Sequence, residues 1–324
     1  MDYIDDRVGR VIAAVMLLLL ANGAAAADSA SAVAADARAS SPTLPAPIDR
    51  SAALRLFDSW KAPVPPRHLL ANIHYVGASG VSSYLITTPE GHILLDTGFE
   101  ETVPIIQRGV EQLGFKLSDI KFILSSHAHI DHTGGHAAMK QLIPQALIVA
   151  SEADARVLAS GGADDFIPFP KELIVYSPVK AGRLVKDGEQ VTLGGVTLTA
   201  NVTPGHTRGA TTWTLQANDG GRTLNVVFFS SASLNAGTRL VGQPAYPEIV
   251  QDFEKTFARL RSLPCDVFFA PHGGQFAMAD KFARQDRGDP NAFVDPQGWL
   301  TLIAAAEKAF RDQLKAEQNA SAAP

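Results

Sequence analysis

Residues 126–135 read S-H-A-H-I-D-H-T-G-G and place three imidazoles and one carboxylate within six positions. His127 and His129 are two residues apart, so both can project from one extended segment toward one metal ion. Asp131 and His132 are adjacent, and in a tight turn they can point to a second ion. An apolar run that predicts a strand precedes this motif, and glycines that permit a sharp turn follow it. Neutral imidazoles and a carboxylate suit Zn²⁺, whereas such a run has no evident role in packing.

Two further histidines also follow predicted strands. His206 lies in T-P-G-H-T-R-G after the strand predicted for 196–202, and His272 lies in F-F-A-P-H-G-G after the strand predicted for 266–270. Turns rich in glycine and proline at strand ends are places where a ligand can be presented. Together with the first motif, the sequence predicts six ligands for two metal ions, three histidines for one and Asp-His-His for the other.

The composition excludes several other classes of protein. Of the 324 residues, 46% are hydrophobic and 19% are charged, so the chain can bury a large core and is not intrinsically disordered. Length alone favours about two domains. The net charge of −5 argues against a nucleic-acid partner, which a basic excess would favour. The single cysteine, Cys265, excludes an internal disulfide framework and any four-cysteine zinc site.

Both ends of the chain differ in composition from its centre. Residues 1–27 predict a cleaved signal peptide, because the apolar run at 11–20 is too short to span a membrane and small residues follow it. Aspartates before that run are atypical of a signal, so an uncleaved anchor or a start codon placed too early stay as alternatives. Residues 28–50 predict a flexible leader and residues 318–324 a disordered tail.

Between the ends, short apolar runs alternate with amphipathic stretches. Strands are predicted at 71–76, 82–87, 92–96, 121–125, 146–150, 196–202, 211–215, 224–229 and 266–270. Helices are predicted at 102–113, 135–142, 152–160, 248–263 and 297–317. The last helix carries an apolar stripe that we expect to pack into the core: Trp299, Ile303, Ala306, Phe310 and Leu314. Mixed strands and helices indicate sheets covered by helices.

The motifs H-A-H-I-D-H, T-P-G-H-T-R-G-A-T-T-W-T and A-P-H-G-G-Q-F-A-M-A-D-K agree in order, spacing and flanking residues with one known family. Over roughly residues 70–290 the sequence resembles the metallo-β-lactamase superfamily, and within it the class B, subclass 3 β-lactamases. Subclasses 1 and 2 use a cysteine in the second zinc site, whereas Cys265 precedes the strand that leads to His272. His132 supplies the histidine that subclass 3 uses instead. The strand predicted for 224–229 runs into F-S-S-A-S-L-N, without the bridging aspartate of glyoxalase-type and many lactonase-type relatives.

The resemblance implies an α/β fold, the αββα sandwich, formed by a single domain over residues 51–317. The expectation of two domains from length is therefore set aside. The resemblance also implies two zinc ions per chain, the first bound by His127, His129 and His206 and the second by Asp131, His132 and His272. For the serine that contacts the substrate carboxylate, Ser233 is the best match, and Ser231 and Asn235 are alternatives.

Other residues near the motifs are expected to support the site without binding metal. Asp96, in L-L-D-T-G, could orient a ligand by a hydrogen bond, and Trp213 is expected to pack beneath the site. We expect His136 to be a solvated helix residue rather than a donor to a ligand. Three histidines outside every motif are interpreted as structural: His68, His74 and His92.

The activity that the resemblance implies is that of a zinc-dependent β-lactamase. Such an enzyme hydrolyses the amide of penicillins, cephalosporins and carbapenems through a metal-bound hydroxide, which Asp131 would help to orient. With the signal peptide, the resemblance implies a periplasmic monomer with a role in antibiotic resistance. Its partner would be a small-molecule β-lactam, with no nucleic acid and no membrane contact after cleavage. The alternatives are a lactonase or thioesterase on the same scaffold, an iron-containing oxidoreductase, and a zinc-binding or partner-binding protein without enzymatic activity.

Overall fold

The computed structural model describes residues 49–322, and its strands form two sheets. The first sheet has seven strands in the order β1 to β7, and the second has five in the order β12-β11-β10-β9-β8. The first sheet contains β1 (Arg67–Leu70), β2 (Ile73–Tyr75), β3 (Tyr84–Thr88), β4 (Gly91–Leu95), β5 (Ile120–Leu124), β6 (Leu147–Ser151) and β7 (Arg183–Val185). The second contains β8 (Gln190–Leu193), β9 (Val196–Val202), β10 (Thr211–Asp219), β11 (Arg222–Phe228) and β12 (Val267–Phe269).

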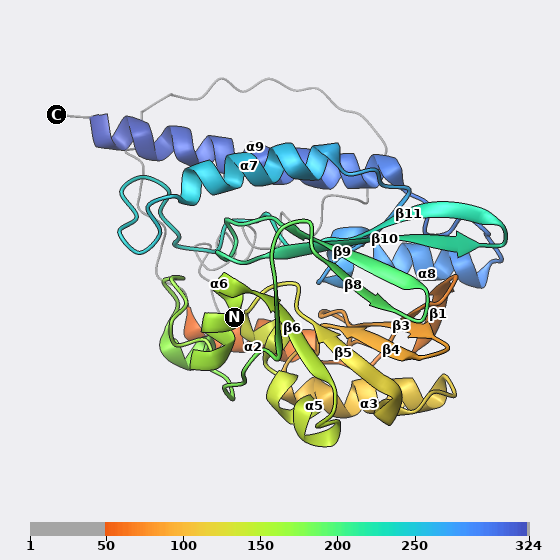
Figure 1. Cartoon of the computed structure of the whole chain (residues 1–324). Coiled ribbons are helices and arrows are strands. Elements are labelled where there is room, and N and C mark those ends of the chain that lie inside the picture. The colour runs from red at the N-terminus through yellow and green to blue at the C-terminus, as the bar shows by residue number, and fades with distance from the viewer. Residues whose placement is uncertain (1–48, 323–324) are drawn as a thin grey trace, which may run out of the picture.

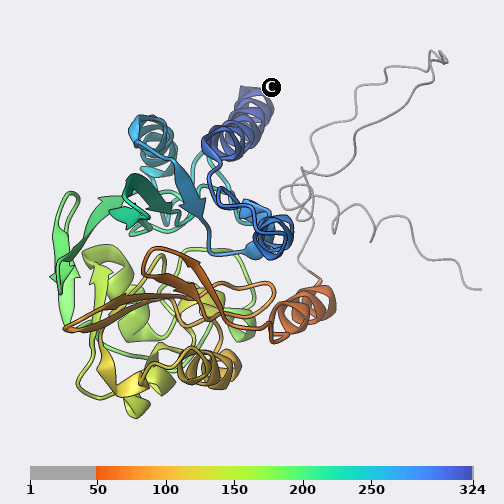
Figure 2. The same ribbon diagram turned by 90° about the vertical axis from the view of Figure 1, so that its right-hand side faces the viewer.

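Helices cover the outer face of each sheet. The α-helices of the described residues are α2 (Arg50–Trp60), α3 (Val103–Gln112), α4 (Ile130–Thr133), α5 (His136–Leu142), α6 (Glu152–Ser160), α7 (Ile249–Ser262), α8 (Met278–Asp286) and α9 (Pro296–Ala322). Helices α3 and α5 lie against the first sheet, and α7 and α9 lie against the second (Figure 1). The turned view in Figure 2 shows the two sheets between these helical layers. The αββα sandwich implied by the sequence is confirmed.

Strand β4 shows how the sequence fills both sides of the first sheet. All five of its residues are buried, as expected for a strand between two layers. Because side chains alternate along a strand, Ile93 and Leu95 join the cluster between the sheets, and Leu94 joins the cluster beneath the helices. Trp213, fully buried in the cluster between the sheets, donates from Nε1 to the carbonyl of Ser125 at 3.0 Å. The predicted place of Trp213 beneath the motif residues is therefore confirmed.

The topology brings the ends of several strands to one edge. Strand β9 pairs antiparallel with β10, β10 pairs antiparallel with β11, and β11 pairs parallel with β12. Strands β9, β11 and β12 therefore run in the same direction and end at the same edge of the second sheet. The end of β5 in the first sheet meets them there, because the amide of Thr211 donates to the carbonyl of Ser126 at 2.7 Å. Each predicted ligand segment follows one of these strand ends.

Several elements were not predicted from the sequence. They are α2, α8 and the short strands β1, β7 and β8. Helix α9 continues to Ala322, so residues 318–322 are helical and do not belong to the disordered tail that we expected. The predicted helix ended at residue 317, soon after the last residue of the apolar stripe, Leu314, although the glutamine and alanines beyond it favour a helix. The stripe itself is buried in the core, as expected.

The loop after α6 begins at a glycine whose conformation other residues rarely adopt. Gly161 ends the helix with φ of 62°, a left-handed conformation that glycine adopts at little cost. A Cβ atom at this position would lie 2.3 Å from the carbonyl oxygen of Tyr176. No larger residue fits here without a shift of the backbone, so this position at the start of the loop of residues 161–170 requires glycine.

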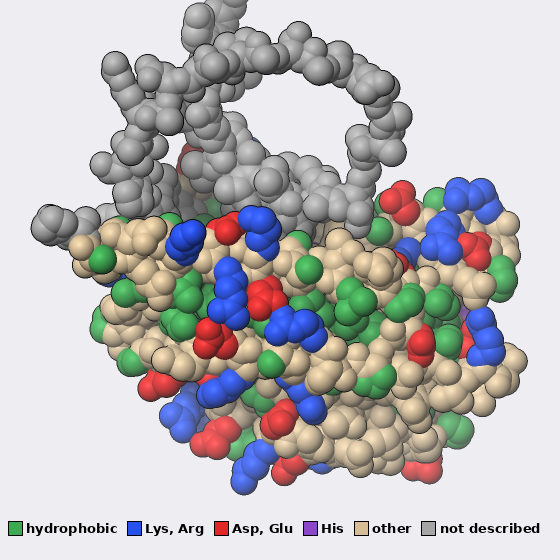
Figure 3. Space-filling model, turned by 90° about the horizontal axis from the view of Figure 1, so that it is seen from above, with side chains coloured by type: hydrophobic (Ala, Val, Ile, Leu, Met, Phe, Trp, Pro, Cys, Tyr) green, Lys and Arg blue, Asp and Glu red, His purple; other side chains and the backbone are tan. Residues whose placement is uncertain are grey.

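The surface on the side of α7 and α9 carries charges of both signs. Figure 3 shows Lys and Arg interspersed with Asp and Glu over this face. Arg311 of α9 lies 3.0 Å from Glu254 of α7, and both side chains are half exposed. Such pairs contribute little to stability, so the buried stripe of α9 provides most of its attachment. Within residues 49–322, no helix combines the length and apolar character needed to cross a membrane.

Candidate metal centre

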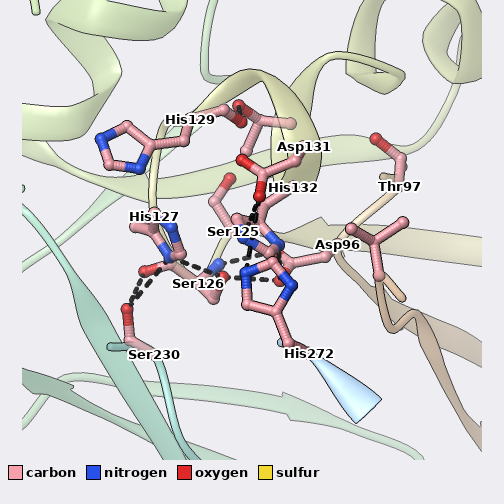
Figure 4. A network of polar contacts seen from close by, with 12 residues as sticks. Asp96, Thr97, Ser125, Ser126, His127, His129, Asp131, His132, Ser230 and His272 are labelled. Atoms are coloured by element: carbon pink, nitrogen blue, oxygen red, sulfur yellow. Dashed lines mark hydrogen bonds and ion pairs between the residues drawn. The ribbon is translucent and has the colours of Figure 1, made fainter. Parts of the chain in front are cut away.

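The six predicted ligands meet at the shared edge of the two sheets. The donor atoms of His127, His129 and His206 all lie within 4.8 Å of one another, and we call these residues the first triad. Those of Asp131, His132 and His272 satisfy the same limit and form the second triad. Figure 4 shows Asp131 in contact with His132 and His272, and His127 beside Ser126 and Ser230. The structure thus brings together the residues that the motifs separate by as many as 145 positions (272 − 127).

The hydrogen bonds around the triads determine which ring nitrogens face inward. His206 donates from Nδ1 to the carbonyl of Ser233 at 2.8 Å, and His272 donates from Nδ1 to that of Gly80 at 3.0 Å. The Nε2 atom of each ring is therefore free to bind an ion. In His127, Nδ1 lies 3.2 Å from the Ser126 hydroxyl, whereas Nε2 is buried without a hydrogen bond.

Buried nitrogens without a partner are rare in folded proteins, because leaving one unsatisfied costs about 1–3 kcal/mol. Both ring nitrogens of His132 and Nε2 of His127 lack a hydrogen bond. Asp131 lies between His132 and His272, with Oδ2 3.1 Å from one Nε2 and 3.5 Å from the other. A bound cation would satisfy these atoms together. The set of nitrogen and carboxylate donors therefore fits a metal centre.

The electrostatics of the triads also suit a cation. Burial lowers the pKa of His206 to about 3 and that of His272 to about 4, so both rings are neutral at pH 7, which is the form that binds metal. Burial alone would raise the pKa of Asp131, but the adjacent His132 and His272 hold it well below its ordinary value. The second triad therefore offers an ionised carboxylate.

Asp96 supports the ligand segment from the end of β4. Its carboxylate accepts hydrogen bonds from the amide and the hydroxyl of Ser126, at 2.7 and 2.6 Å, and Oδ2 lies 4.0 Å from Nδ1 of His132. Burial raises its pKa to about 6. Its φ of 58° is rare for a residue other than glycine, and such strain is common at functional sites. We expected Asp96 to make a hydrogen bond directly to a ligand. Its nearest ligand atom is instead Nδ1 of His132, at 4.0 Å, which is too far for a hydrogen bond.

Asp154 holds the two segments of the first triad together. This buried residue of α6 accepts from the amide of Ala128, between His127 and His129, at 3.0 Å. It also accepts from the hydroxyl of Thr207 and the amide of Gly209, each at 3.0 Å. The sequence interpretation did not single out Asp154, because a lone aspartate in the first turn of a helix is ordinarily a solvated residue favoured by the helix dipole.

His136 is not the solvated residue that we expected. It is fully buried, with Nδ1 2.7 Å from the Thr97 hydroxyl and Nε2 2.9 Å from the Ser125 hydroxyl. The prediction was wrong because helix α5 turns its first residue inward, against the end of β5. His136 thus links the turn after β4 to the turn that leads into the ligand motif.

We expect His136 to make the metal-free protein less stable in acid. Burial lowers its pKa to about 3, whereas an unfolded histidine titrates near 6.5. As the pH falls below 6.5, the unfolded chain takes up a proton that the folded chain refuses, so stability is lost from pH 6.5 down toward pH 3. Between pH 7 and pH 5 this group accounts for a loss on the order of 2 kcal/mol. Urea unfolding of His136→Gln should show a correspondingly weaker dependence on pH, and exposed His68→Gln should match wild type.

The three candidate substrate contacts lie around His206. The hydroxyl of Ser233 lies 3.1 Å from that of Ser231 and 3.3 Å from Nδ1 of His206. The side-chain amide of Asn235 donates to the carbonyl of His206 at 3.2 Å. All three therefore border the first triad, and which of them contacts a substrate stays a prediction. Ser230, which the sequence did not single out, donates to the Ser126 carbonyl at 2.9 Å, and its hydroxyl lies 3.5 Å from Nδ1 of His127.

The remaining histidines and the single cysteine lie outside the triads. His74 and His92 are buried, and both pack edge-on against Phe115, at ring distances of 5.0 and 5.1 Å. Their interpretation as structural residues agrees with this packing. Cys265 is half-buried and donates to the carbonyl of Val267. Trp60 of α2 was missed by the sequence interpretation, and its ring lies 4.7 Å from that of His272.

A known family shares this fold and these motifs. A family model described as the metallo-beta-lactamase superfamily matches residues 76–272, a range that includes every residue of both triads. The chain therefore belongs to the metallo-β-lactamase superfamily.

Solved structures of subclass B3 enzymes are similar over most of the described chain. The native FEZ-1 metallo-β-lactamase from Legionella gormanii has a TM-score of 0.78 at 38% identity, covering 79% of this chain and 98% of the other. BJP-1, a subclass B3 metallo-β-lactamase of Bradyrhizobium japonicum, has a TM-score of 0.75 at 40% identity, covering 81% and 98%.

Curated relatives match at lower identity. The lactamase-like protein vrtG of Penicillium aethiopicum is 24% identical over 209 residues, which are 64% of this chain and 56% of that protein. An atrochrysone carboxyl ACP thioesterase of Aspergillus fumigatus is 22% identical over 219 residues, 64% of this chain and 43% of that protein. The chain spans about half the length of the curated relatives it matches.

Proposed function

We propose that this protein is a zinc-dependent β-lactamase that binds two zinc ions per chain. The observation that carries the proposal is the pair of adjacent triads, one of three histidines and one of Asp-His-His. The identity of 38–40% to subclass B3 enzymes supports the same activity. Zinc bound there would supply a nucleophile at neutral pH, because it lowers the pKa of water toward about 7, and would polarise the carbonyl of the substrate.

The protein residues contribute position and charge. The first triad is made only of histidines, so an ion held there would keep its full positive charge available to a carbonyl oxygen. Asp131 places one negative charge in the second triad and can orient the attacking water by a hydrogen bond. Ser233, with Ser231 and Asn235 as alternatives, can donate to the carboxylate of a β-lactam. In the overall reaction a water oxygen bonds to the carbonyl carbon, the amide C–N bond breaks, and the nitrogen takes a proton.

We also propose where this activity takes place. Residues 1–27 have the composition of a cleaved signal peptide, which would deliver a monomer to the periplasm. These residues lie outside the described part of the chain. β-Lactams act outside the cytoplasm, so an exported enzyme would protect the cell from antibiotics.

The test is hydrolysis of one penicillin, one cephalosporin and one carbapenem, with and without a chelator. We expect turnover that disappears with the chelator and returns with Zn²⁺. Zinc-loaded, folded protein without turnover of any of the three would contradict the proposal. An acyl thioester and a lactone belong in the same assay, because a thioesterase is among the curated relatives. Hydrolysis of these two alone would assign the metal centre to that other class of substrate.

A further inference from the structure

A buried carboxylate outside both triads faces a ligand of the first. Asp165 lies in the loop of residues 161–170, and its side chain is only 3% exposed. Its Oδ2 atom lies 3.2 Å from Nε2 of His129, within ion-pair distance, although the contact lacks the angle of a hydrogen bond and Nε2 has no other polar partner. Its Oδ1 atom accepts a hydrogen bond from the amide of Ile167 at 3.3 Å. Each carboxylate oxygen therefore faces a different nitrogen donor, one from the loop itself and one from the ligand motif.

This arrangement distinguishes His129 from the other ligands of its triad. The outer nitrogen of His206 faces a backbone carbonyl, and that of His127 faces a serine hydroxyl, both of which are neutral. Only His129, among the three, has a carboxylate behind it. Because Nε2 faces Asp165, Nδ1 is the nitrogen left for an ion. Burying the charge of an aspartate costs free energy unless a partner compensates it. The place of Asp165 beside His129 is therefore a specific feature of the site.

The loop that carries Asp165 is held firmly on both sides. It begins at Gly161, whose carbonyl accepts a hydrogen bond from the amide of Tyr176 at 2.9 Å. Two residues after Asp165, Ile167 is buried in a small cluster with Leu173 and Ile174. The carboxylate is therefore presented to His129 by packed structure, and it can fix the orientation of the imidazole ring.

We propose that Asp165 is a positioning residue that accepts a hydrogen bond from Nε2–H of His129 in the metal-bound protein and so commits Nδ1 to the first metal ion. The inference rests on the metal centre of the proposed function. A carboxylate that accepts from a ligating histidine fixes the tautomer and orientation of the ring and makes the ligand more basic, and losing such a partner typically costs 10–100-fold in metal affinity. The role joins the loop of residues 161–170 directly to the metal centre.

Asp165→Asn is the informative substitution because it keeps the size of the side chain. An amide has one oxygen and one NH₂ group, whereas Asp165 faces two donors, Ile167 N–H and His129 Nε2–H. If the oxygen stays with Ile167, the NH₂ group faces His129 and favours the tautomer with the proton on Nδ1. That tautomer cannot bind metal through Nδ1. Asp164→Asn is the matched control, since Asp164 is the exposed neighbour in the same loop.

The experiment measures zinc affinity by competition with a chromophoric chelator. Wild type and Asp164→Asn should bind two zinc ions equally well, and Asp165→Asn should bind one of them about 10–100-fold more weakly. Far-UV circular dichroism and the thermal midpoint of the metal-free proteins should not differ. Unchanged affinity for both ions in Asp165→Asn, or an equal loss in Asp164→Asn, would overturn the inference.

A second measurement needs no variant. Nitrogen-15 NMR of the zinc-loaded wild type should find His129 protonated at Nε2 and bound to metal through Nδ1. Metal bound through Nε2 would overturn the inference while leaving the proposed function intact. A wild-type protein that binds no zinc would overturn both. Failure of the positioning role is thus distinguishable from failure of the proposed function.

Discussion

Replacing His127 or Asp131 by alanine is expected to lower kcat/KM for β-lactam hydrolysis by about 10³-fold or more. Loss of a single donor that stabilises a developing oxyanion already costs about 10²–10³-fold in an enzyme, and loss of a ligand disables a whole metal position. The two residues belong to different triads. Their substitutions should therefore remove different ions and reach inactivity by separate routes.

Zinc stoichiometry makes this result specific. Each variant should retain one zinc ion where wild type holds two, and excess Zn²⁺ should not restore activity to Asp131→Ala, because the ionised carboxylate is missing. His68→Ala is the control, since His68 is an exposed histidine of β1 outside both triads. It should match wild type in zinc content and in rate. If either variant keeps the turnover of wild type, the substituted residue is not part of the catalytic centre.

The sequence predicted the fold well wherever hydrophobic periodicity and short motifs were strong. Strands such as β5 and β9, whose apolar runs end in ligand motifs, have bounds close to those expected. The short edge strand β7 has only three residues, one of them polar, so it is too short to show a period. Helix α2 has no fully buried residue, and its attachment depends on contacts such as that of Trp60 with His272, which only the folded chain reveals.

The residues of the two triads were predictable from the sequence, but the residues that support them were not. Metal ligands carry a strong signal because several rare residue types recur at short spacing next to strand ends. Asp154 and Asp165 have no such signal, since each acts through a segment distant in the sequence. The error at His136 has the same origin. Its burial depends on packing against Thr97 and Ser125, whereas its helical position alone suggested an exposed residue.

The second large effect is expected on stability, from Asp154→Ala. The substitution leaves two buried amides, of Ala128 and Gly209, and the hydroxyl of Thr207 without their acceptor. Each lost partner costs about 1–3 kcal/mol. An opposing effect reduces the total, because burial raises the pKa of Asp154 to about 6, so that ionising it in the folded protein at pH 7 costs about 3 kcal/mol. Alanine is free of this cost, and the net loss at pH 7 should be roughly 2–4 kcal/mol.

The pH dependence separates this explanation from a simple loss of packing. Because the folded pKa of Asp154 is raised, the folded chain binds more protons than the unfolded chain between about pH 6 and pH 4, and this residue stabilises wild type as the pH falls. The difference between wild type and Asp154→Ala should therefore grow by about 1 kcal/mol from pH 7 to pH 5. Urea unfolding of the metal-free proteins at both pH values measures it. Glu152→Ala, which removes an exposed carboxylate from the same helix, should show neither the loss nor its pH dependence. If the loss of stability in Asp154→Ala is the same at pH 7 and pH 5, the pKa of Asp154 is not raised in the folded protein. The substitution would then have removed packing alone.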